Sequence, residues 1–177
     1  MDLQGKIPVI SVVAAKSGIG KTTLLEKVIK ILKQRGIRLA IIKHDTHSFE
    51  IDHPGKDTWR HAQAGADIVV ISSPEKLAII EKREKELTLD EVVSRISGVD
   101  IIITEGYKRG NKPKIEVYRS SVHKELLSQP QELIAIAGDV KWDLGVPCYH
   151  IDDAQGVADE IEKFMKKFDE SSSHECE

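Results

Sequence analysis

Short runs of apolar residues rich in Ile and Val recur along the chain, separated by segments in which apolar residues follow a helical period. Runs with so few polar interruptions predict strands that are covered on both faces, as in a parallel sheet packed between helices. Five runs have this character, at residues 9–14, 39–43, 68–72, 99–104 and 133–137. The pattern predicts an α/β domain of three layers with a mostly parallel central sheet.

Helical periodicity is clearest after the first of these runs. Residues 23–34 place five apolar side chains on one face, and Gly36 follows as a stop signal. The five are Leu24, Leu25, Val28, Ile31 and Leu32. A capping box at residues 88–91 predicts a second helix, and a last helix over residues 153–168 is expected to cover the sheet. Residues 77–81 and 114–118 predict two further strands, the second of alternating character.

Length, charge and cysteine content narrow the class of protein. The 177 residues fit one domain, residues 1–168, followed by a polar tail, 169–177, that is predicted to be disordered. A formal net charge of −3 argues against a general nucleic-acid binder. Cys148 and Cys176 form no paired motif, which favours a cytoplasmic protein without a disulfide framework. No apolar run approaches the ~20 residues needed to span a bilayer, so neither export nor membrane insertion is expected.

A glycine-rich segment joins the first predicted strand to the first predicted helix: residues 15–22 read Ala-Lys-Ser-Gly-Ile-Gly-Lys-Thr. In such a loop, backbone N–H groups converge on phosphate oxygens, the helix presents its positive end, and Lys21 adds a charge. The chain is therefore predicted to have a P-loop NTPase fold and to bind a nucleotide. Thr22 is predicted to bind Mg²⁺ through its hydroxyl group. The residues expected to contact the nucleotide are Lys16, Ser17, Gly18, Ile19, Gly20, Lys21, Thr22 and Thr23.

Polar residues follow the other predicted strands, at the edge of the sheet where α/β proteins bind their ligands. Asp45 and Glu105 are the acidic candidates for holding the metal and its water ligands and for positioning an attacking water, with Lys21 as the cationic catalytic residue. Asp139 is a candidate for bidentate pairing with a guanine edge, although the chain lacks a clear Asn-Lys-x-Asp element and a turn residue is the alternative. The side chains of Lys43, His44, Lys108 and Arg119 are expected to line the phosphate or partner surface.

Two other interpretations concern the same loops. His44, His47 and His53, with Asp45 and Asp52, contain transition-metal ligands, but their spacing matches no standard site and phosphate contact or solvation is favoured instead. Lys16 matches the early lysine in the variant phosphate loop of dimeric ATPases, which reaches the partner subunit's nucleotide; an exposed loop lysine is the favoured alternative. Asp57 is expected to cap a helix at residues 58–64.

A series of motifs over residues 8–153 resembles the MobB family of molybdopterin-guanine dinucleotide biosynthesis adaptor proteins. The motifs are the phosphate loop, Lys43-His44-Asp45 with His47, and the segments 52–57, 64–67, 104–108 and 113–119. The resemblance implies a GTP-binding protein with weak GTPase activity, commonly dimeric, that works with the guanylyltransferase MobA, which attaches GMP to molybdopterin. Family members usually have glycine where this chain has Ala15, which leaves the loop geometry and the hydrolysis rate open.

Three hypotheses for the function follow from these observations. In the first, GTP and Mg²⁺ bind at the loop and are slowly hydrolysed, because positioned charge beyond the loop supplies most of the rate of phosphoryl transfer. In the second, the protein is a non-hydrolytic adaptor whose nucleotide holds a conformation for a partner. Molybdopterin is a further candidate partner under any of the hypotheses. In the third, it is a small-molecule kinase, although the sequence identifies no acceptor pocket or lid.

Overall fold

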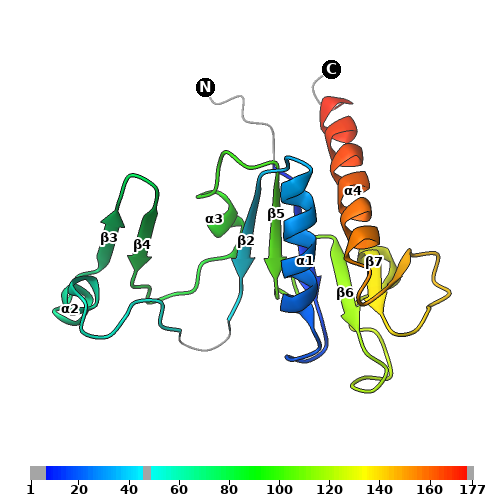
Figure 1. Cartoon of the computed structure of the whole chain (residues 1–177), viewed down its shortest axis with the longest axis horizontal. Helices are drawn as coiled ribbons and strands as arrows, with labels where there is room; N and C mark the ends of the chain where they lie inside the picture. The colour runs from blue at the N-terminus through cyan, green and yellow to red at the C-terminus, as the bar shows by residue number, and fades with distance from the viewer. Residues whose placement is uncertain (1–6, 46–48, 175–177) are drawn as a thin grey trace. The chain divides into compact units, whose positions relative to one another are not determined.

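The computed structural model describes residues 7–45 and 49–174 (Figure 1). Contacts divide the chain into two compact units. The first unit comprises Met1–His44 and Leu89–Glu177, and the second comprises Asp45–Thr88. Among the described residues, no helix has the length and apolar character needed to cross a membrane.

The first unit is built on a six-stranded parallel sheet with the strand order β2-β5-β1-β6-β7-β8. The strands are β1 (Val9–Val13), β2 (Leu39–Lys43), β5 (Ile101–Glu105), β6 (Lys114–Tyr118), β7 (Leu133–Gly138) and β8 (Cys148–His150). The helices are α1 (Lys21–Gln34), α3 (Leu89–Val93) and α4 (Ala154–His174), with a 3₁₀ turn at Pro130–Glu132. The predicted three-layer α/β fold is confirmed.

The helices lie on the two faces of this sheet. Figure 1 shows α1 and α4 beside each other, and their apolar side chains form one core with β1, β5, β6 and β7. A smaller cluster on β1, β2 and β5 packs against α3. Burial on both faces explains why the predicted central runs contain almost no polar residue. The carboxyl ends of β1, β5 and β6 consequently meet at one edge of the sheet, where the loops carry the predicted site.

Helix α1 ends where the sequence predicts. Gly36 adopts a φ of 81°, its N–H bonds the Lys33 carbonyl at 3.1 Å, and the Ile37 N–H bonds the Leu32 carbonyl at 3.1 Å. This is a Schellman arrangement, which needs a left-handed residue and therefore favours glycine. It turns the chain from α1 toward β2, completing the predicted strand, crossover helix and parallel strand.

The prediction for residues 68–72 is wrong in one respect. They form strand β3 (Ile68–Ser72), but β3 pairs antiparallel with β4 (Leu77–Glu81) in a separate two-stranded sheet of the second unit, beside α2 (Asp57–Gln63). Its apolar residues are not covered on both faces: Ile68 is 55% exposed, and Ile79 on β4 is 61% exposed. An apolar run shows that a strand is suitable for burial, but it does not show which elements cover that strand.

The predicted disordered tail is also wrong over residues 169–174, because α4 continues through His174. The rings of Phe164 and Phe168 contact each other, and the hydroxyl groups of Ser171 and Ser172 donate to the Phe168 carbonyl at 2.8 and 2.9 Å. The serines therefore bond to the preceding turn of the helix, a role that their polarity alone does not reveal. Residues 175–177 of the predicted tail lie outside the described residues.

An ion pair joins the amino ends of β2 and β5, at the edge opposite the predicted site. Arg38 donates to Asp100 through its backbone N–H at 2.7 Å and through Nη2 at 2.6 Å. The side-chain hydrogen bond from Arg38, followed by the backbone bond, holds the pKa of Asp100 below its ordinary value of 3.8. Because the folded pKa is lowered, ionised Asp100 stabilises the fold above the unfolded pKa, and this contribution is lost as the pH falls through the folded pKa.

We expect Asp100→Asn to flatten the acid limb of the stability curve. The free energy of unfolding, measured with urea at a series of pH values from about 5 to about 3, should fall less steeply in this variant than in the wild type. Arg38→Gln should flatten the same limb, because it removes the group that lowers the pKa of Asp100. Acid limbs of equal slope in all three proteins would contradict this account.

Candidate functional site

The loop between β1 and α1 is a candidate anion cradle. Gly18 and Gly20 take left-handed φ angles of 75° and 111°, and Gly20 is the N-cap of α1. The Gly20 carbonyl accepts the first helical bond, from the Leu24 N–H at 3.0 Å. Gly20 has no side chain to cap the helix, and the first turn of α1 contains no acidic residue. The first N–H groups of α1 therefore keep their capacity to bind an anion, and the helix dipole favours one.

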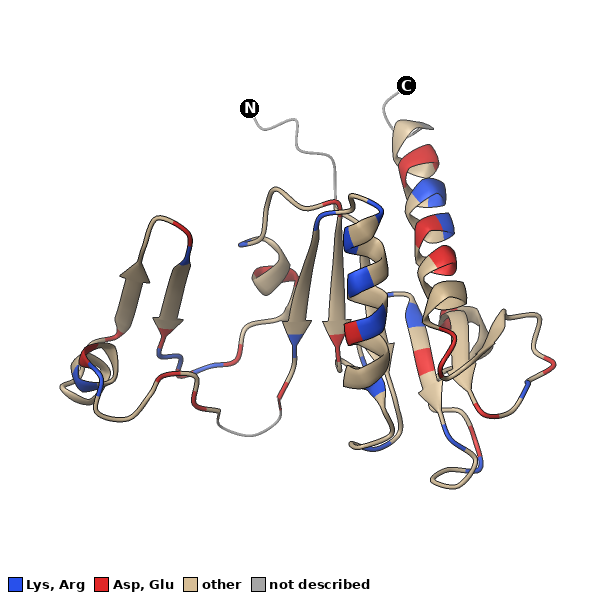
Figure 2. Ribbon diagram, viewed as in Figure 1, with Lys and Arg blue, Asp and Glu red and all other residues tan. Residues whose placement is uncertain are grey.

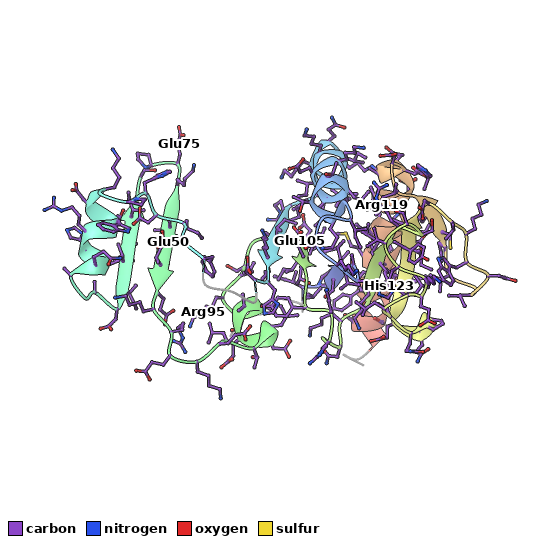
Figure 3. All side chains as sticks on the ribbon, turned by 90° about the horizontal axis from the view of Figure 1, so that it is seen from below. Glu50, Glu75, Arg95, Glu105, Arg119 and His123 are labelled. Carbon is purple, nitrogen blue, oxygen red and sulfur yellow. The ribbon has the colours of Figure 1, made fainter. Side chains whose placement is uncertain are left out.

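Side chains that follow the two strands on either side of β1 hold this loop through its carbonyl groups. Lys108, after β5, donates from Nζ to the Ala15 carbonyl at 2.8 Å, and Arg119, after β6, donates from Nε to the Ile19 carbonyl at 2.8 Å. Because these carbonyls are engaged by cations, the loop is held in a fixed shape without using its N–H groups. Figure 3 shows Arg119 projecting from the segment that follows β6 and Glu105 from the end of β5.

Lys21, the first residue of α1, lies in a cluster of charges. Burial lowers the pKa of its ammonium group, the charge of Glu105 acts in the opposite direction, and the charges of Lys108 and Lys43 lower the pKa further. Figure 2 shows the basic tip of β2 and the acidic tip of β5, which are Lys43 and Glu105 in register. Three cations around one carboxylate make a site that suits a polyanion carrying a metal ion.

Thr22 and Glu105, the predicted metal ligands, contact each other. The Thr22 hydroxyl donates to Oε1 of Glu105 at 2.9 Å. A hydroxyl oxygen and a carboxylate oxygen are the ligands that Mg²⁺ prefers, and Mg²⁺ needs only one or two protein ligands when phosphate oxygens and waters complete its shell. The residues present therefore fit a nucleotide-bound Mg²⁺.

The backbone after Glu105 adopts a conformation that brings Lys108 to the loop. Gly106 has a φ of 109°, and a Cβ atom there would lie 3.2 Å from Cβ of His44. Tyr107 is left-handed at a φ of 52°, and its ring stacks on His44 with centroids 4.4 Å apart. His44 is also anchored by its N–H, which donates to the Glu105 carbonyl at 3.0 Å. A left-handed non-glycine residue carries strain that the surrounding contacts must hold, and here it adjoins the phosphate loop.

The remaining predicted residues divide between the two units. Asp45 opens the second unit, whose position relative to the first is not determined, so its water-positioning role stays a prediction. His47 lies outside the described residues. Asp52 accepts the His53 N–H and the Thr58 hydroxyl, each at 2.9 Å, and Asp57 lies in the first turn of α2. Within the described part of the chain, no group of three His, Cys, Asp or Glu side chains is arranged to hold a metal ion.

Asp139, the predicted guanine-binding residue, is engaged by a neighbouring loop. Its two carboxylate oxygens accept the Ser120 N–H at 2.9 and 3.1 Å, and Oδ2 accepts the Ser120 hydroxyl at 2.9 Å. The backbone bond from Ser120 is the main cause of the lowered pKa of Asp139. Asp139 therefore fixes the loop after β6, and a guanine edge would have to displace these bonds.

Strand β6 supplies a network that sequence reasoning missed. Lys114 and Glu116 are 2% and 1% exposed, so the expected alternation of buried and exposed residues is wrong. Lys114 pairs with Glu132, whose pKa is lowered chiefly by that bond. Glu116 accepts the N–H groups of residues 127 and 128 at 2.7 and 2.9 Å, and the Tyr118 hydroxyl donates to the carbonyl of residue 123 at 2.6 Å. Every second residue of β6 thus pins the irregular segment 119–132 that adjoins the phosphate loop.

Comparison with known proteins identifies the family. The family model for "Molybdopterin guanine dinucleotide synthesis protein B", MobB, matches residues 9–139. The chain belongs to the MobB family. The chain is 39% identical over 160 residues to the molybdopterin-guanine dinucleotide biosynthesis adapter protein of Escherichia coli K12, covering 87% of this chain and 91% of that protein. The Haemophilus influenzae adapter protein is 32% identical over 168 residues, with 94% of each chain covered.

Solved MobB structures share the fold. A crystal structure of molybdopterin-guanine biosynthesis protein B aligns with a TM-score of 0.68 and 30% identity over 88% of this chain and 99% of that one. The Bacillus subtilis MobB structure aligns with a TM-score of 0.69 and 25% identity over 89% and 97% of the two chains. The phosphate loop and its braces, Lys108 and Arg119, lie within the residues that the MobB family model matches.

Proposed function

We propose that this MobB-family chain binds GTP with Mg²⁺ at the loop between β1 and α1 and acts as a nucleotide-dependent accessory protein when GMP is attached to molybdopterin. The observation that carries the proposal is the uncapped start of α1, held open by Lys108 and Arg119 with Lys21 beside it. The names of its relatives, which are molybdopterin-guanine dinucleotide biosynthesis adapter proteins, support the biosynthetic step.

In this proposal each residue of the first unit has a defined task. The N–H groups of residues 18–23 bind the phosphates, and Lys21 neutralises their charge. Thr22 and Glu105 hold Mg²⁺, which when bound polarises the phosphate oxygens. Lys43 and Lys108 raise the positive potential on the side of Glu105, as their effect on the Lys21 pKa indicates. Asp45 is the proposed water-positioning residue.

Hydrolysis is expected to be slow. Glu105 is already bonded to Thr22 and is assigned here to the metal ion, so it is not free to position the attacking water. Phosphoryl transfer depends on positioned groups, and a P-loop GTPase without an arginine finger turns over at on the order of 10⁻⁴ s⁻¹. In this proposal the protein works with the guanylyltransferase MobA, which the adapter names of its relatives support. It also forms a homodimer, which the exposed apolar residues of β3 and β4 support.

The test is a titration of the purified protein with GTP and with ATP in Mg²⁺, following bound nucleotide and released phosphate together. We expect GTP to bind at least about tenfold more tightly than ATP, ~1.4 kcal/mol, with little phosphate released. An absence of nucleotide binding would overturn the proposal. If labelled phosphate passed to an organic acceptor, the protein would be a kinase.

A non-hydrolytic adaptor role is the second candidate, favoured by the engagement of Glu105 with Thr22. A non-hydrolysable GTP analogue separates the two roles in a MobA-dependent assay of GMP attachment. Equal stimulation by GTP and by the analogue would show that occupancy of the site suffices, because bound nucleotide then acts by shifting a conformational population.

A further inference from the structure

Two strand-end segments converge on the last glycine of the phosphate loop, on the side away from Glu105. Nη2 of Arg119, after β6, and Cδ1 of Ile151, after β8, each lie 3.7 Å from the point where a Cβ atom on Gly20 would stand. Ile151 is buried, whereas Asp152, the next residue, has a side chain that is 70% exposed. Arg119 thus lies beside the start of α1, and Asp152 pairs with Lys27 in the second turn of the same helix.

The two sides of the loop differ in chemistry. The β5 side has Lys21, Lys108, Lys43 and the pair of Thr22 with Glu105, which suits the terminal phosphates and their metal ion. The β6 to β8 side has one planar guanidinium, oriented by its bond to the Ile19 carbonyl, and two carboxylates. A planar cation stacks on aromatic rings, and a carboxylate accepts two N–H donors from one edge of a guanine base. A nucleotide with its phosphates in the cradle would therefore direct its nucleoside to this second side.

The two carboxylates, both exposed, differ in how firmly they are held. Both oxygens of Asp139 are engaged by Ser120. Asp152 makes longer contacts, with Lys27 of α1 at 3.2 Å through Oδ1 and with Nδ1 of His150 at 3.7 Å through Oδ2. These side chains are exposed, and exposed ion pairs contribute little to stability. Its neighbour Asp153 performs the capping task at α4, accepting the Gly156 N–H at 2.9 Å, so Asp152 is not needed there. The charged and titratable groups facing Asp152 are Lys27, His150 and Arg119.

We infer that the nucleoside of the bound nucleotide lies against Arg119 and that the carboxylate of Asp152, rather than that of Asp139, reads the guanine base. The inference rests on the proposed function and adds the residue that sets the base preference. Guanine presents two adjacent donors, N1–H and the 2-amino group, to a carboxylate. Adenine presents an unprotonated N1 at that position, which a carboxylate repels.

The test changes the hydrogen-bonding groups of both the protein, by Asp152→Asn, and the base, by replacing guanine with xanthine. Xanthine carries a carbonyl in place of the 2-amino group, so an asparagine amide N–H can donate to it where an aspartate cannot. In Asp152→Asn we expect the affinity for GTP to fall about 10- to 100-fold and the affinity for xanthosine triphosphate to rise. Inorganic triphosphate, which has no base, should bind the variant and the wild type to within about twofold. Affinities are measured by calorimetry in Mg²⁺.

Two matched variants serve as controls. Asp139→Asn makes the same change at the other carboxylate and should leave the ratio of GTP to xanthosine triphosphate affinity unaltered. Lys27→Met breaks the ion pair but keeps Asp152, and should also leave that ratio unaltered. The inference would be overturned if the ratio of GTP to xanthosine triphosphate affinity were unchanged in Asp152→Asn, or if it changed in Asp139→Asn instead. Binding of inorganic triphosphate would in that case still support the phosphate-binding loop. If the wild type bound neither GTP nor inorganic triphosphate, both the inference and the proposed function would be overturned.

Discussion

Replacing Lys21 with alanine should weaken GTP binding by about 100-fold, ~2.7 kcal/mol, because the variant loses a charge-assisted contact with the phosphates at a partly desolvated position. Burial lowers the pKa of this ammonium group, which marks it as a cation held close to low-dielectric surroundings. Phosphate binding relieves that cost by supplying opposite charge. Equilibrium titration with GTP in Mg²⁺ measures the effect directly.

Lys30→Ala is the matched control, since Lys30 is an exposed lysine on the same helix, nearly three turns beyond the loop. It carries the same change in net charge, so any general electrostatic effect on GTP affinity appears in both variants. The free energy of unfolding without nucleotide should differ little between them. Equal GTP affinity in Lys21→Ala and Lys30→Ala would refute the assignment of the cradle.

Replacing Glu116 with alanine should give the largest loss of stability, about 3–5 kcal/mol. Glu116 is buried on β6 and accepts two backbone N–H groups, from Leu127 at 2.7 Å and Ser128 at 2.9 Å. The truncation leaves both donors without their acceptor, creates a cavity and leaves buried Lys114 in a less negative environment. Urea denaturation followed by circular dichroism measures the change in the free energy of unfolding.

Glu26→Ala on the exposed face of α1 is the control and should change stability by no more than about 0.5 kcal/mol. Glu116→Gln separates charge from shape, because it keeps one carbonyl oxygen for one of the two donors and should lie between the wild type and Glu116→Ala. A loss in Glu116→Ala as small as that in Glu26→Ala would mean that the segment 119–132 does not depend on its attachment to β6.

Much of this fold can be predicted from local features of the sequence, namely apolar runs and glycine positions. Four strands of the central layer, β1, β2, β5 and β7, lie where apolar runs are nearly continuous, and β6 lies where apolar and polar residues alternate. The glycine pattern at residues 18–20 needs backbone angles that few other residues adopt. Strand β8 was missed because its three residues, Cys148–His150, are too few to show a periodic pattern of apolar side chains. Residues 68–72 have the composition of a central strand, and only their antiparallel partner, residues 77–81, distinguishes them.

Sequence motifs predicted which residues of the candidate site lie together. They did not predict the contacts that a side chain makes with residues distant in the sequence. Lys21, Thr22 and Glu105 lie together because the carboxyl ends of β1 and β5 are adjacent. Asp139 has the right residue type and position for base recognition, yet Ser120 from the neighbouring loop engages both of its oxygens. The burial of Lys114 follows from its place in the middle of a six-stranded sheet, which its alternating sequence does not indicate.

The contacts that shape the phosphate loop join residues 83, 93 and 100 positions apart in the chain. Contacts of such high sequence separation close late in folding, because much of the chain must already be ordered before they form. A peptide spanning only the first strand and helix would lack all three. A ligand that binds the loop only in the folded protein would therefore stabilise the whole sheet, including strands that it does not touch. The melting temperature of the sheet should rise with the logarithm of the ligand concentration.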